Sequence, residues 1–439
     1  MRNNNPLITT DSYKPSHFEQ YPVGTNHVYS YIEARGSKIE GVTDVVHFGL
    51  QKYIRDELMT PITARDVEEA KTFYAEHGVP FNYDGWMRIV KVHGGFLPIT
   101  VWAVPEGTPV PVGNLVVRVA NMDEQLPWLT SYVETAILRA TWYGSTVATL
   151  SREMKKIIKH YLDLTSDNAD AELPFKLHDF GCRGVSSLES AAIGGCAHLV
   201  NFMGSDTVPG ILLARDCYDA EGMPAYSIPA SEHSTMTLRG REHEQESYQA
   251  MVDAYAHPGK IFACVSDSYD IYNAVKNIWL GAGLIKQVKE RGATVVIRPD
   301  SGDPVQTPVE VIEILIEGLA DEVTVNSKGY AVLPDYVRVI QGDGIDIDDV
   351  KKILAELEHR KISAANIAFG MGGGLLQKVN RDTFKFAMKA SAALVDGKLI
   401  EVYKDPITDA GKKSKRGIMD LFRTKDGEFK TLRHDNGEV

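Results

Sequence analysis

A glycine-rich segment directly follows one of the buried-looking strands of the sequence. Residues 370–374 read Gly-Met-Gly-Gly-Gly, which places four glycines in five positions after the apolar run 367–369. Because glycine has no Cβ, main-chain N–H groups in such a segment can approach a phosphate, but close packing explains it about as often. The spacing matches neither the dinucleotide-binding fingerprint nor a Walker A loop. Any use of ATP must therefore rely on another arrangement.

Charged side chains follow two further apolar runs. Arg298 and Asp300 come after the run 295–297, and Asp343 comes after the run 337–340. Arginine forks, carboxylates and glycine loops at one rim are the groups that can hold a phosphorylated sugar and Mg²⁺. Opposite charges at such a rim could equally form structural salt bridges. Asp300 and Asp343 are the candidate metal ligands.

The histidines and cysteines are less informative on their own. A lone histidine such as His233, in Ser-Glu-His-Ser-Thr, is more often a structural hydrogen-bonding residue than a catalyst. His243 lies in Arg-Glu-His-Glu, which lacks the second histidine of an HExxH zinc site. No CxxC pair occurs, so neither a zinc site nor a disulfide framework is indicated by the four cysteines, Cys182, Cys196, Cys217 and Cys264.

The elements that must position these residues change in character near residue 174. Residues 26–33 and 92–121 alternate β-branched or aromatic with polar residues, which predicts antiparallel strands, and helical periodicity follows over 126–143 and 151–164. From about residue 174, short apolar runs end in charged residues or glycine and are followed by amphipathic stretches. This alternation implies a parallel sheet and favours a β/α barrel, with an open doubly wound sheet as the alternative.

The expected fold is therefore α/β with two domains. A mixed, β-rich domain is predicted for residues 1–150, completed by 385–439, and the β/α barrel for residues 151–384. A length of 439 residues is consistent with two domains.

The bulk properties narrow the possible partners and location. A formal charge of −12 and a pI near 5.6 argue against a general nucleic-acid binder. The sequence has neither a signal-peptide h-region nor an apolar stretch long enough to cross a membrane, so we expect a cytoplasmic protein. A basic run at 412–416 reads by default as a solvated turn, with a phosphate contact as the functional alternative.

Several blocks taken together resemble the nicotinamide phosphoribosyltransferases, which are type II phosphoribosyltransferases. They are residues 10–14 (Thr-Asp-Ser-Tyr-Lys), 178–181 (His-Asp-Phe-Gly), 183–187 (Arg-Gly-Val-Ser-Ser), 204–207 (Gly-Ser-Asp-Thr) and 229–235 (Pro-Ala-Ser-Glu-His-Ser-Thr). Later blocks keep the family's order, at 265–273, 297–302, 326–330, 338–346, 366–378 and 404–406. The resemblance covers nearly the whole chain.

This resemblance implies an irregular β/α barrel with an additional β-rich α+β domain, assembled as a head-to-tail homodimer with shared active sites. Phe180 would stack on one face of the pyridine ring of nicotinamide, and Tyr13 of the partner subunit on the other. Asp206 would accept a hydrogen bond from the carboxamide and repel the carboxylate of nicotinate.

The resemblance also implies a set of residues for the sugar phosphate. Arg183, Arg298 and Arg381 would bind the ring amide or the phosphates, and the Gly372 and Gly373 amides the 5′-phosphate. Asp300 and Asp343 would hold the ribose hydroxyls or Mg²⁺. The diphosphate or ATP path would be lined by Lys389, Lys404 and Lys412, and the substrate-binding set would be completed by Ser227, Ser266 and Gly342.

His233 resembles the family's phosphorylated histidine, which takes the γ-phosphoryl group of ATP, with Asp270 as its orienting carboxylate and Asp300 as a further catalytic residue. The expected reaction transfers phosphoribosyl from phosphoribosyl pyrophosphate to nicotinamide, giving nicotinamide mononucleotide and pyrophosphate in NAD salvage. Three alternatives remain: nicotinate phosphoribosyltransferase, which Asp206 disfavours, a non-catalytic binding protein on the same scaffold, and a metal-dependent lyase on a generic barrel.

Overall fold

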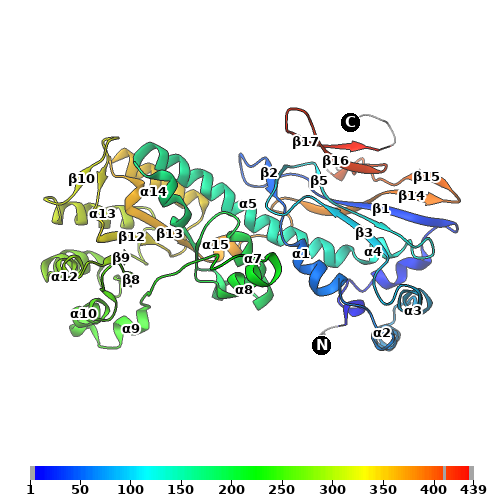
Figure 1. Ribbon diagram of the computed structural model, residues 1–439, viewed down its shortest axis with the longest axis horizontal. Coiled ribbons are helices and arrows are strands. Elements are labelled where there is room, and N and C mark those ends of the chain that lie inside the picture. Colours follow the sequence, from blue (N-terminus) through cyan, green and yellow to red (C-terminus); the bar gives the residue numbers. More distant parts are fainter. Residues whose placement is uncertain (1–4, 409–411, 435–439) are drawn as a thin grey trace. The chain divides into compact units, whose positions relative to one another are not determined.

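The computed structural model describes residues 5–408 and 412–434 and divides the chain into two compact units (Figure 1). Unit 1 comprises residues 1–149 and 380–439, and unit 2 comprises residues 150–379. The division falls within the long helix α5 (Glu134–Thr165). In the described part of the chain, no helix is long and apolar enough to span a membrane.

Unit 1 is built on a five-stranded antiparallel sheet in the order β15-β14-β1-β5-β3. The central pair joins the two ends of the chain, because β1 is paired with β14 along its whole length, with Ser30 opposite Ala390. The sheet strands are β1 (Thr25–Ala34), β3 (Ile99–Ala103), β5 (Leu115–Asn121), β14 (Phe386–Val395) and β15 (Lys398–Glu401). Residues from both termini therefore form one core.

Short helices and two small sheets complete unit 1. Its core packs Trp86 edge-on against Tyr132 and Trp128, with ring centroids 4.8 and 5.0 Å apart. The helices are η1 (Pro6–Ile8), η2 (Lys14–Glu19), α1 (Leu50–Tyr53), η3 (Ile54–Leu58), α2 (Ala64–His77), α3 (Tyr83–Val92) and α4 (Leu129–Tyr132). Two hairpin-like sheets pair β2 (Asp44–Val46) with β4 (Pro109–Pro111) and β16 (Met419–Arg423) with β17 (Phe429–Arg433).

Unit 2 contains six parallel strands in the order β7-β6-β13-β12-β9-β8. The segment 226–230 forms parallel bridges with both edge strands, from Tyr226 to Gly204 and from Ala230 to Ala263. These bridges close the sheet into an irregular barrel whose elements follow one another in chain order, which confirms the expected fold class. The strands are β6 (Leu177–Asp179), β7 (Gly204–Ser205), β8 (Ile261–Val265), β9 (Thr294–Arg298), β12 (Val337–Gln341) and β13 (Ile367–Met371).

Helices cover the outside of the barrel, and Figure 1 shows them flanking its strands. Helix α10 packs against β8, α12 against β9 and α13 against β12, because the outward strand side chains are apolar and must be buried. The longer helices are α7 (Leu188–His198), α8 (Val208–Tyr218), α10 (Glu244–Tyr255), α12 (Leu284–Glu290), α13 (Gln306–Gly318) and α14 (Ile347–His359). The remaining elements are α6 (Ala169–Glu172), η4 (Leu173–Phe175), η5 (Cys182–Gly184), α9 (His233–Thr237), η6 (Arg241–His243), α11 (Ile271–Asn273), η7 (Ala274–Gly281), β10 (Thr324–Val325), β11 (Ala331–Val332), η8 (Ala364–Asn366) and α15 (Gly373–Leu376).

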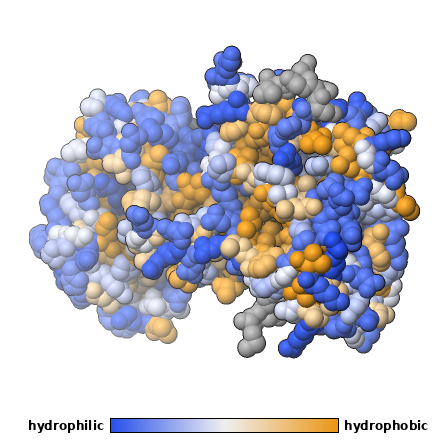
Figure 2. All heavy atoms as spheres, turned by 45° about the vertical axis from the view of Figure 1, so that its right-hand side comes forward, coloured by the Kyte–Doolittle hydropathy of each residue, from blue (hydrophilic) through white to orange (hydrophobic). Residues whose placement is uncertain are grey.

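The surface is mostly hydrophilic on the face shown in Figure 2, with apolar side chains gathered in patches between the polar ones. Exposed apolar side chains of unit 2 include Leu188 of α7 together with Val208 and Leu212 of α8. Beneath these side chains the two helices approach each other closely. A Cβ added to Gly210 would lie only 2.6 Å from the carbonyl carbon of Gly195. The helix pair therefore depends on glycine at this contact.

We expect Gly210→Ala to destabilise the protein. Alanine gains about 1 kcal/mol of helix propensity, but forcing a methyl group into a filled space costs about 1–3 kcal/mol. The net loss in the free energy of unfolding should approach about 2 kcal/mol at most, measured by chemical denaturation. Gly36→Ala is the control, because its added Cβ would come no closer than 3.7 Å to the nearest atom considered. Equal stabilities of the two variants would contradict this account of the helix contact.

Candidate active site

A cavity of about 630 Å³ runs through the inside of the barrel in unit 2. Its lining includes the first residues of strands, such as Thr294 and Ile367, and groups at the carboxyl ends, such as Arg298 and Phe180. The cavity therefore extends along the full length of the strands. In barrels of this kind the carboxyl ends of the strands carry the reactive groups, so the candidate site lies at that end.

The ring of Phe180 is seated against main chain at the ends of two strands. A Cβ on Gly370 would lie only 2.0 Å from Phe180 Cε2, and one on Gly342 would lie 2.9 Å from the same atom. Any side chain at these positions would displace the ring. Gly342, predicted as a substrate contact, thus has a clear role in placing Phe180, and no signal in the sequence linked these glycines to the aromatic ring.

Asp206 and Ser227 lie beside Phe180 in the same cavity. The Ser227 hydroxyl, on the segment that closes the barrel, donates a hydrogen bond to Asp206 Oδ1. This bond leaves the second carboxylate oxygen of Asp206 as an acceptor for a ligand. The site therefore combines a flat apolar ring with an oriented negative charge.

His178 forms part of the cavity wall close to Asp206. Its Nε2 lies 3.0 Å from the Phe175 carbonyl oxygen, which requires the proton on Nε2. Burial lowers the pKa of His178, and the nearby Asp206 carboxylate only partly offsets this. The imidazole is therefore neutral near pH 7 and does not cancel the charge of Asp206.

His233 forms a second cluster with two carboxylates at this end of the barrel. Its Nε2 lies 2.8 Å from Asp267 Oδ1, and its Nδ1 lies 3.9 Å from Asp300 Oδ2. Burial by itself raises the pKa of Asp267, but hydrogen bonds from Ser301 and His233 outweigh burial and lower the pKa overall. Asp267 is therefore an ionised acceptor that fixes the imidazole.

This geometry corrects the expected partner of His233. Asp270 was expected to orient the imidazole, but its carboxylate instead caps helix α11 by accepting the Asn273 N–H at 3.0 Å. Asp267 precedes it by three residues in the same Ser-Asp-Ser-Tyr-Asp block, so the motif was found but the wrong carboxylate was chosen. Only the backbone turn distinguishes them, and that turn is not readable from residue types.

Ser266 also has a different role from the expected substrate contact. Its side chain is fully buried, its hydroxyl donates to the Cys264 carbonyl at 3.1 Å, and it accepts the indole N–H of Trp279 at 3.0 Å. These bonds hold the end of β8 against η7. The residue supports the loop that carries Asp267 and does not face the cavity.

Arg298 connects the cavity with the His233 cluster. It lines the cavity, and its Nε donates to Asp300 Oδ1 at 2.7 Å, while the other oxygen of Asp300 faces His233. The rim salt bridge considered from the sequence is thus present as the Arg298–Asp300 pair. This pair also connects the cavity lining with the His233 cluster. Asp343, exposed after β12, carries no bond that ties it to this pair in the described contacts.

The glycine segment lies next to the loop that carries Arg183. A Cβ on Gly184 would lie 3.5 Å from the Gly373 nitrogen, whereas the space beside Gly373 itself is open. Gly372 precedes the short helix α15, and Arg183 is exposed. The main chain at Gly373 is therefore accessible to a ligand.

In the part of the chain that is described, no group of three His, Cys, Asp or Glu side chains could hold a metal ion. Magnesium usually keeps several waters and binds one or two carboxylates together with substrate phosphates. The single carboxylates of Asp300 and Asp343 suit that mode rather than a closed protein site.

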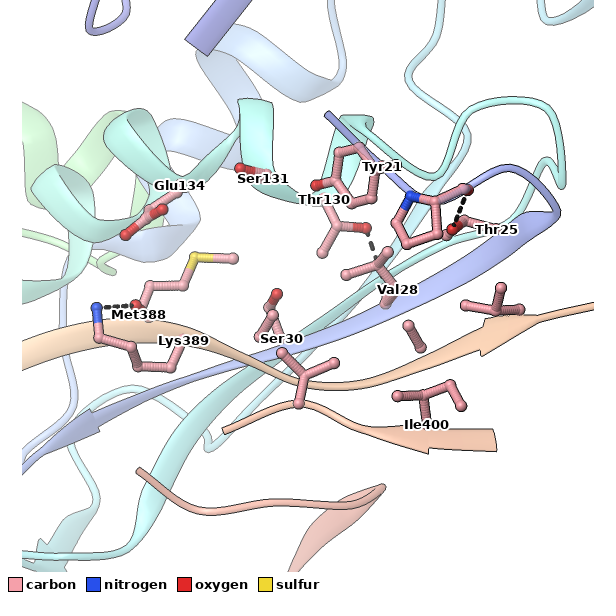
Figure 3. Close-up of a pocket in the computed structure, with 15 residues that line it drawn as sticks. Tyr21, Thr25, Val28, Ser30, Thr130, Ser131, Glu134, Met388, Lys389 and Ile400 are labelled. Carbon is pink, nitrogen blue, oxygen red and sulfur yellow. Dashed lines mark hydrogen bonds between the residues drawn. The ribbon is translucent and has the colours of Figure 1, made fainter. Parts of the chain in front are cut away.

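Unit 1 carries the remaining predicted residues. Tyr13 is 57% exposed, and its loop is tied to the start of α5 by the ion pair between Lys14 and Glu134. Glu134 also lines a cavity of about 370 Å³ beside Lys389, whose Nζ donates to the Met388 carbonyl at 2.9 Å (Figure 3). Tyr13 and Lys389 are thus held by neighbouring parts of one unit.

The basic segment of unit 1 is largely paired. Lys413 lies 3.0 Å from Asp405, Arg416 lies 3.3 Å from Glu401, and Lys415 pairs with Glu33. Most of the run therefore forms local ion pairs, which neither the solvated-turn nor the phosphate-contact interpretation included. The other predicted cations of this unit, all exposed, are Arg381, Lys404 and Lys412.

The fold is that of the type II phosphoribosyltransferases. The structure resembles the nicotinate-nucleotide pyrophosphorylase of Pyrococcus furiosus with a TM-score of 0.61 at 16% identity, covering 100% of this chain and 86% of that one. It also resembles human nicotinic acid phosphoribosyltransferase with a TM-score of 0.55 at 16% identity, covering 88% of this chain and 74% of that one. At these identities the likeness concerns the fold.

Sequence relatives identify the family more narrowly. Residues 175–437 match the nicotinate phosphoribosyltransferase family, and residues 5–101 match the N-terminal domain of nicotinamide phosphoribosyltransferase. A nicotinamide phosphoribosyltransferase of Xanthomonas campestris pv. campestris is 52% identical over 95% of this chain and 88% of its own length. That of Acinetobacter baylyi is 32% identical over 96% and 89%. The chain belongs to the nicotinate phosphoribosyltransferase family, among the nicotinamide phosphoribosyltransferases, and is an enzyme of phosphoribosyl transfer in NAD salvage.

The support role of Ser266 can be tested by Ser266→Ala. Losing the hydroxyl leaves the buried Trp279 N–H without its acceptor, which should cost about 1–3 kcal/mol of unfolding free energy in chemical denaturation. The KM values for the substrates should stay within about twofold because the residue does not face the cavity. Ser268→Ala is the matched control, since its buried hydroxyl has no hydrogen-bond partner among the described residues. Weakened substrate binding at unchanged stability would instead support a direct contact between Ser266 and the substrate.

Proposed function

We propose that the protein transfers the phosphoribosyl group of phosphoribosyl pyrophosphate to nicotinamide, releasing pyrophosphate, and couples this to ATP through a phosphohistidine. The observation that carries the nicotinamide assignment is the pairing of Phe180, seated on Gly342 and Gly370, with the oriented Asp206 in one cavity. A flat uncharged ring with an amide substituent matches both groups.

The acceptor is recognised by stacking and by charge. The pyridine ring lies on Phe180, and its carboxamide N–H₂ donates to the oxygen of Asp206 that Ser227 does not occupy. Nicotinate would bring a second carboxylate to this point, where it would be repelled by the like charge of Asp206. Neutral His178 leaves this repulsion intact.

A homodimer completes the site in this proposal. Tyr13 of the partner subunit covers the second face of the pyridine ring, which agrees with its exposure in the chain described here. Lys389, Lys404, Lys412 and Arg381 of the same unit would then supply cations for the diphosphate. Arg183, Arg298 and the Gly372 and Gly373 amides would hold the 5′-phosphate side.

The transfer step is a displacement at the anomeric carbon. The bond from this carbon to the pyrophosphate oxygen breaks, pyrophosphate leaves with the electron pair, and the pyridine nitrogen forms the new bond from the opposite face. The protein orients both reactants and stabilises the separating charges, so no protein nucleophile is needed. Mg²⁺ bound with the diphosphate would lower the charge on the leaving group, and Asp300 and Asp343 are the residues that would hold it.

ATP coupling uses His233. Because Nε2 carries its proton toward Asp267, Nδ1 presents a lone pair that can attack the γ-phosphorus. The bond to the ADP oxygen breaks as the nitrogen–phosphorus bond forms, and water later hydrolyses the phosphohistidine to phosphate. Asp267, and not Asp270, stabilises the charge that develops on the ring.

The amide selectivity can be tested by Asp206→Asn. Removing the negative charge should lower the ratio of kcat/KM for nicotinamide to kcat/KM for nicotinate by about tenfold or more, since it removes the repulsion between Asp206 and the nicotinate carboxylate. Asp216→Asn on the exposed part of α8 makes the same charge change as a control. Wild-type protein that uses nicotinate faster than nicotinamide would refute the substrate assignment.

The phosphohistidine can be tested by incubation with γ-labelled ATP. His233→Ala should abolish acid-labile labelling and the stimulation by ATP. Asp267→Asn should slow labelling by about tenfold or more because the charge that develops on the imidazole loses the carboxylate that stabilises it. Asp270→Asn should have a much smaller effect, since that carboxylate caps a helix. Labelling that persists in His233→Ala, or that depends on Asp270 and not on Asp267, would overturn this part of the proposal.

A further inference from the structure

Asp179 is a buried carboxylate directly beneath the pyridine site that the mechanism above does not use. It is the last residue of β6, between His178 and Phe180, and its side chain is fully buried. Strand alternation points it away from the cavity that His178 lines. Burying a carboxylate costs free energy unless hydrogen bonds or nearby charges compensate it, so the contacts of Asp179 indicate its role.

The Asp179 side chain holds the turn that presents Phe180. Its Oδ1 accepts the Gly181 N–H at 2.7 Å, which closes a turn around Phe180. A Cβ on Gly181 would lie 3.0 Å from this oxygen and 2.6 Å from Leu376 Cδ1, so a side chain there would crowd the turn. The bond therefore fixes the direction in which the aromatic ring leaves the strand.

The main chain of the same residue holds the amide-recognising carboxylate. The Asp179 carbonyl accepts the Asp206 N–H at 2.9 Å, and Asp179 is opposite Ser205 in the β6–β7 pairing. Thr207, which follows Asp206, has a side chain that lowers the pKa of Asp179. Among the described residues, neither Asp179 Oδ2 nor the Thr207 hydroxyl forms a hydrogen bond of normal distance and angle. Both halves of the pyridine site thus attach to one residue.

We propose that Asp179 is the positioning residue of the pyridine site, setting the distance between the stacking ring and the amide-binding carboxylate. This inference rests on the proposed function. It predicts that damage at Asp179 weakens nicotinamide binding most, because only Arg183 among the proposed phosphate-binding groups follows the same strand, whereas Arg298 ends β9 and the Gly372 and Gly373 amides follow β13. Asp179 touches no substrate and acts only through Phe180 and Asp206.

The surroundings of the carboxyl make its protonation measurable. Burial raises the pKa of Asp179 to about 6, against the opposing effect of the Gly181 N–H. The titratable groups around it are Asp206 beyond β7, His178 on its own strand, His198 of α7, and Cys182 and Arg183 in the following turn. Burial lowers the pKa of both His178 and His198. Protonation of Asp179 turns a charged acceptor into a neutral one, which about halves the strength of its hydrogen bond.

The decisive experiment compares Asp179→Ala, Asp179→Asn and wild type in steady-state kinetics with both substrates. Asp179→Ala should raise the KM for nicotinamide about tenfold or more and leave the KM for phosphoribosyl pyrophosphate within about twofold. Asp179→Asn keeps the Oδ1 acceptor and should recover most of this loss at pH 7.5. Asp346→Ala is the control, because it also removes a carboxylate that accepts main-chain N–H groups, at the start of α14, without belonging to the cavity lining.

Equal effects of Asp179→Ala on both KM values, or an asparagine variant as impaired as the alanine variant, would overturn the role. If the alanine variant does not fold, a pH series decides. Wild type should show a rise of about threefold in the KM for nicotinamide as pH falls from 7.5 to 5.5, because the charged acceptor is lost. Asp179→Asn should show no such rise, and identical profiles would overturn the proposal. A wild type that turns over nicotinamide while these comparisons fail refutes Asp179 alone, whereas no turnover refutes the proposed function.

Discussion

The contact between the Phe180 ring and the bare main chain of Gly342 and Gly370 is the constraint on which the rest of the site depends. Gly342 directly follows β12 and Gly370 lies near the end of the neighbouring β13, and a side chain on either would occupy the space of the ring. The ring therefore lies as close to the barrel wall as an aromatic group can. This leaves room above it for a second flat ring, which a wall of ordinary side chains would fill.

Charge is distributed around this ring in a consistent way. Three carboxylates of the site have dedicated partners: Asp267 has Ser301 and His233, Asp300 has Arg298, and Asp206 has Ser227. Histidine close to Asp206 is kept neutral by burial. His178 therefore does not neutralise Asp206, so this part of the site can select its ligand by charge.

The sequence predicted those elements that depend on the pattern of neighbouring residues. Strands β9, β12 and β13 were predicted closely because their apolar, β-branched runs must be buried on both faces. The two-residue strand β7 and the closing segment 226–230 were missed because they are too short to carry a period. The partner of His233 and the role of Gly342 depend on backbone direction in three dimensions, which residue types do not encode. The family resemblance supplied the residue set, but not these contacts.

Folding of the two ends of the chain into unit 1 places several predicted site residues on one domain. Pairing of β1 with β14 places Lys389 on a strand next to the N-terminal segment, and the Lys14–Glu134 ion pair fixes the loop of Tyr13 to the start of α5. The aromatic ring and the cations that the proposed dimer lends to a neighbouring barrel are therefore carried by one unit with one core. Because the aromatic ring and the cations belong to the same unit, they reach the neighbouring barrel together. Stacking on the pyridine ring and binding of the diphosphate are therefore coupled in the proposed dimer.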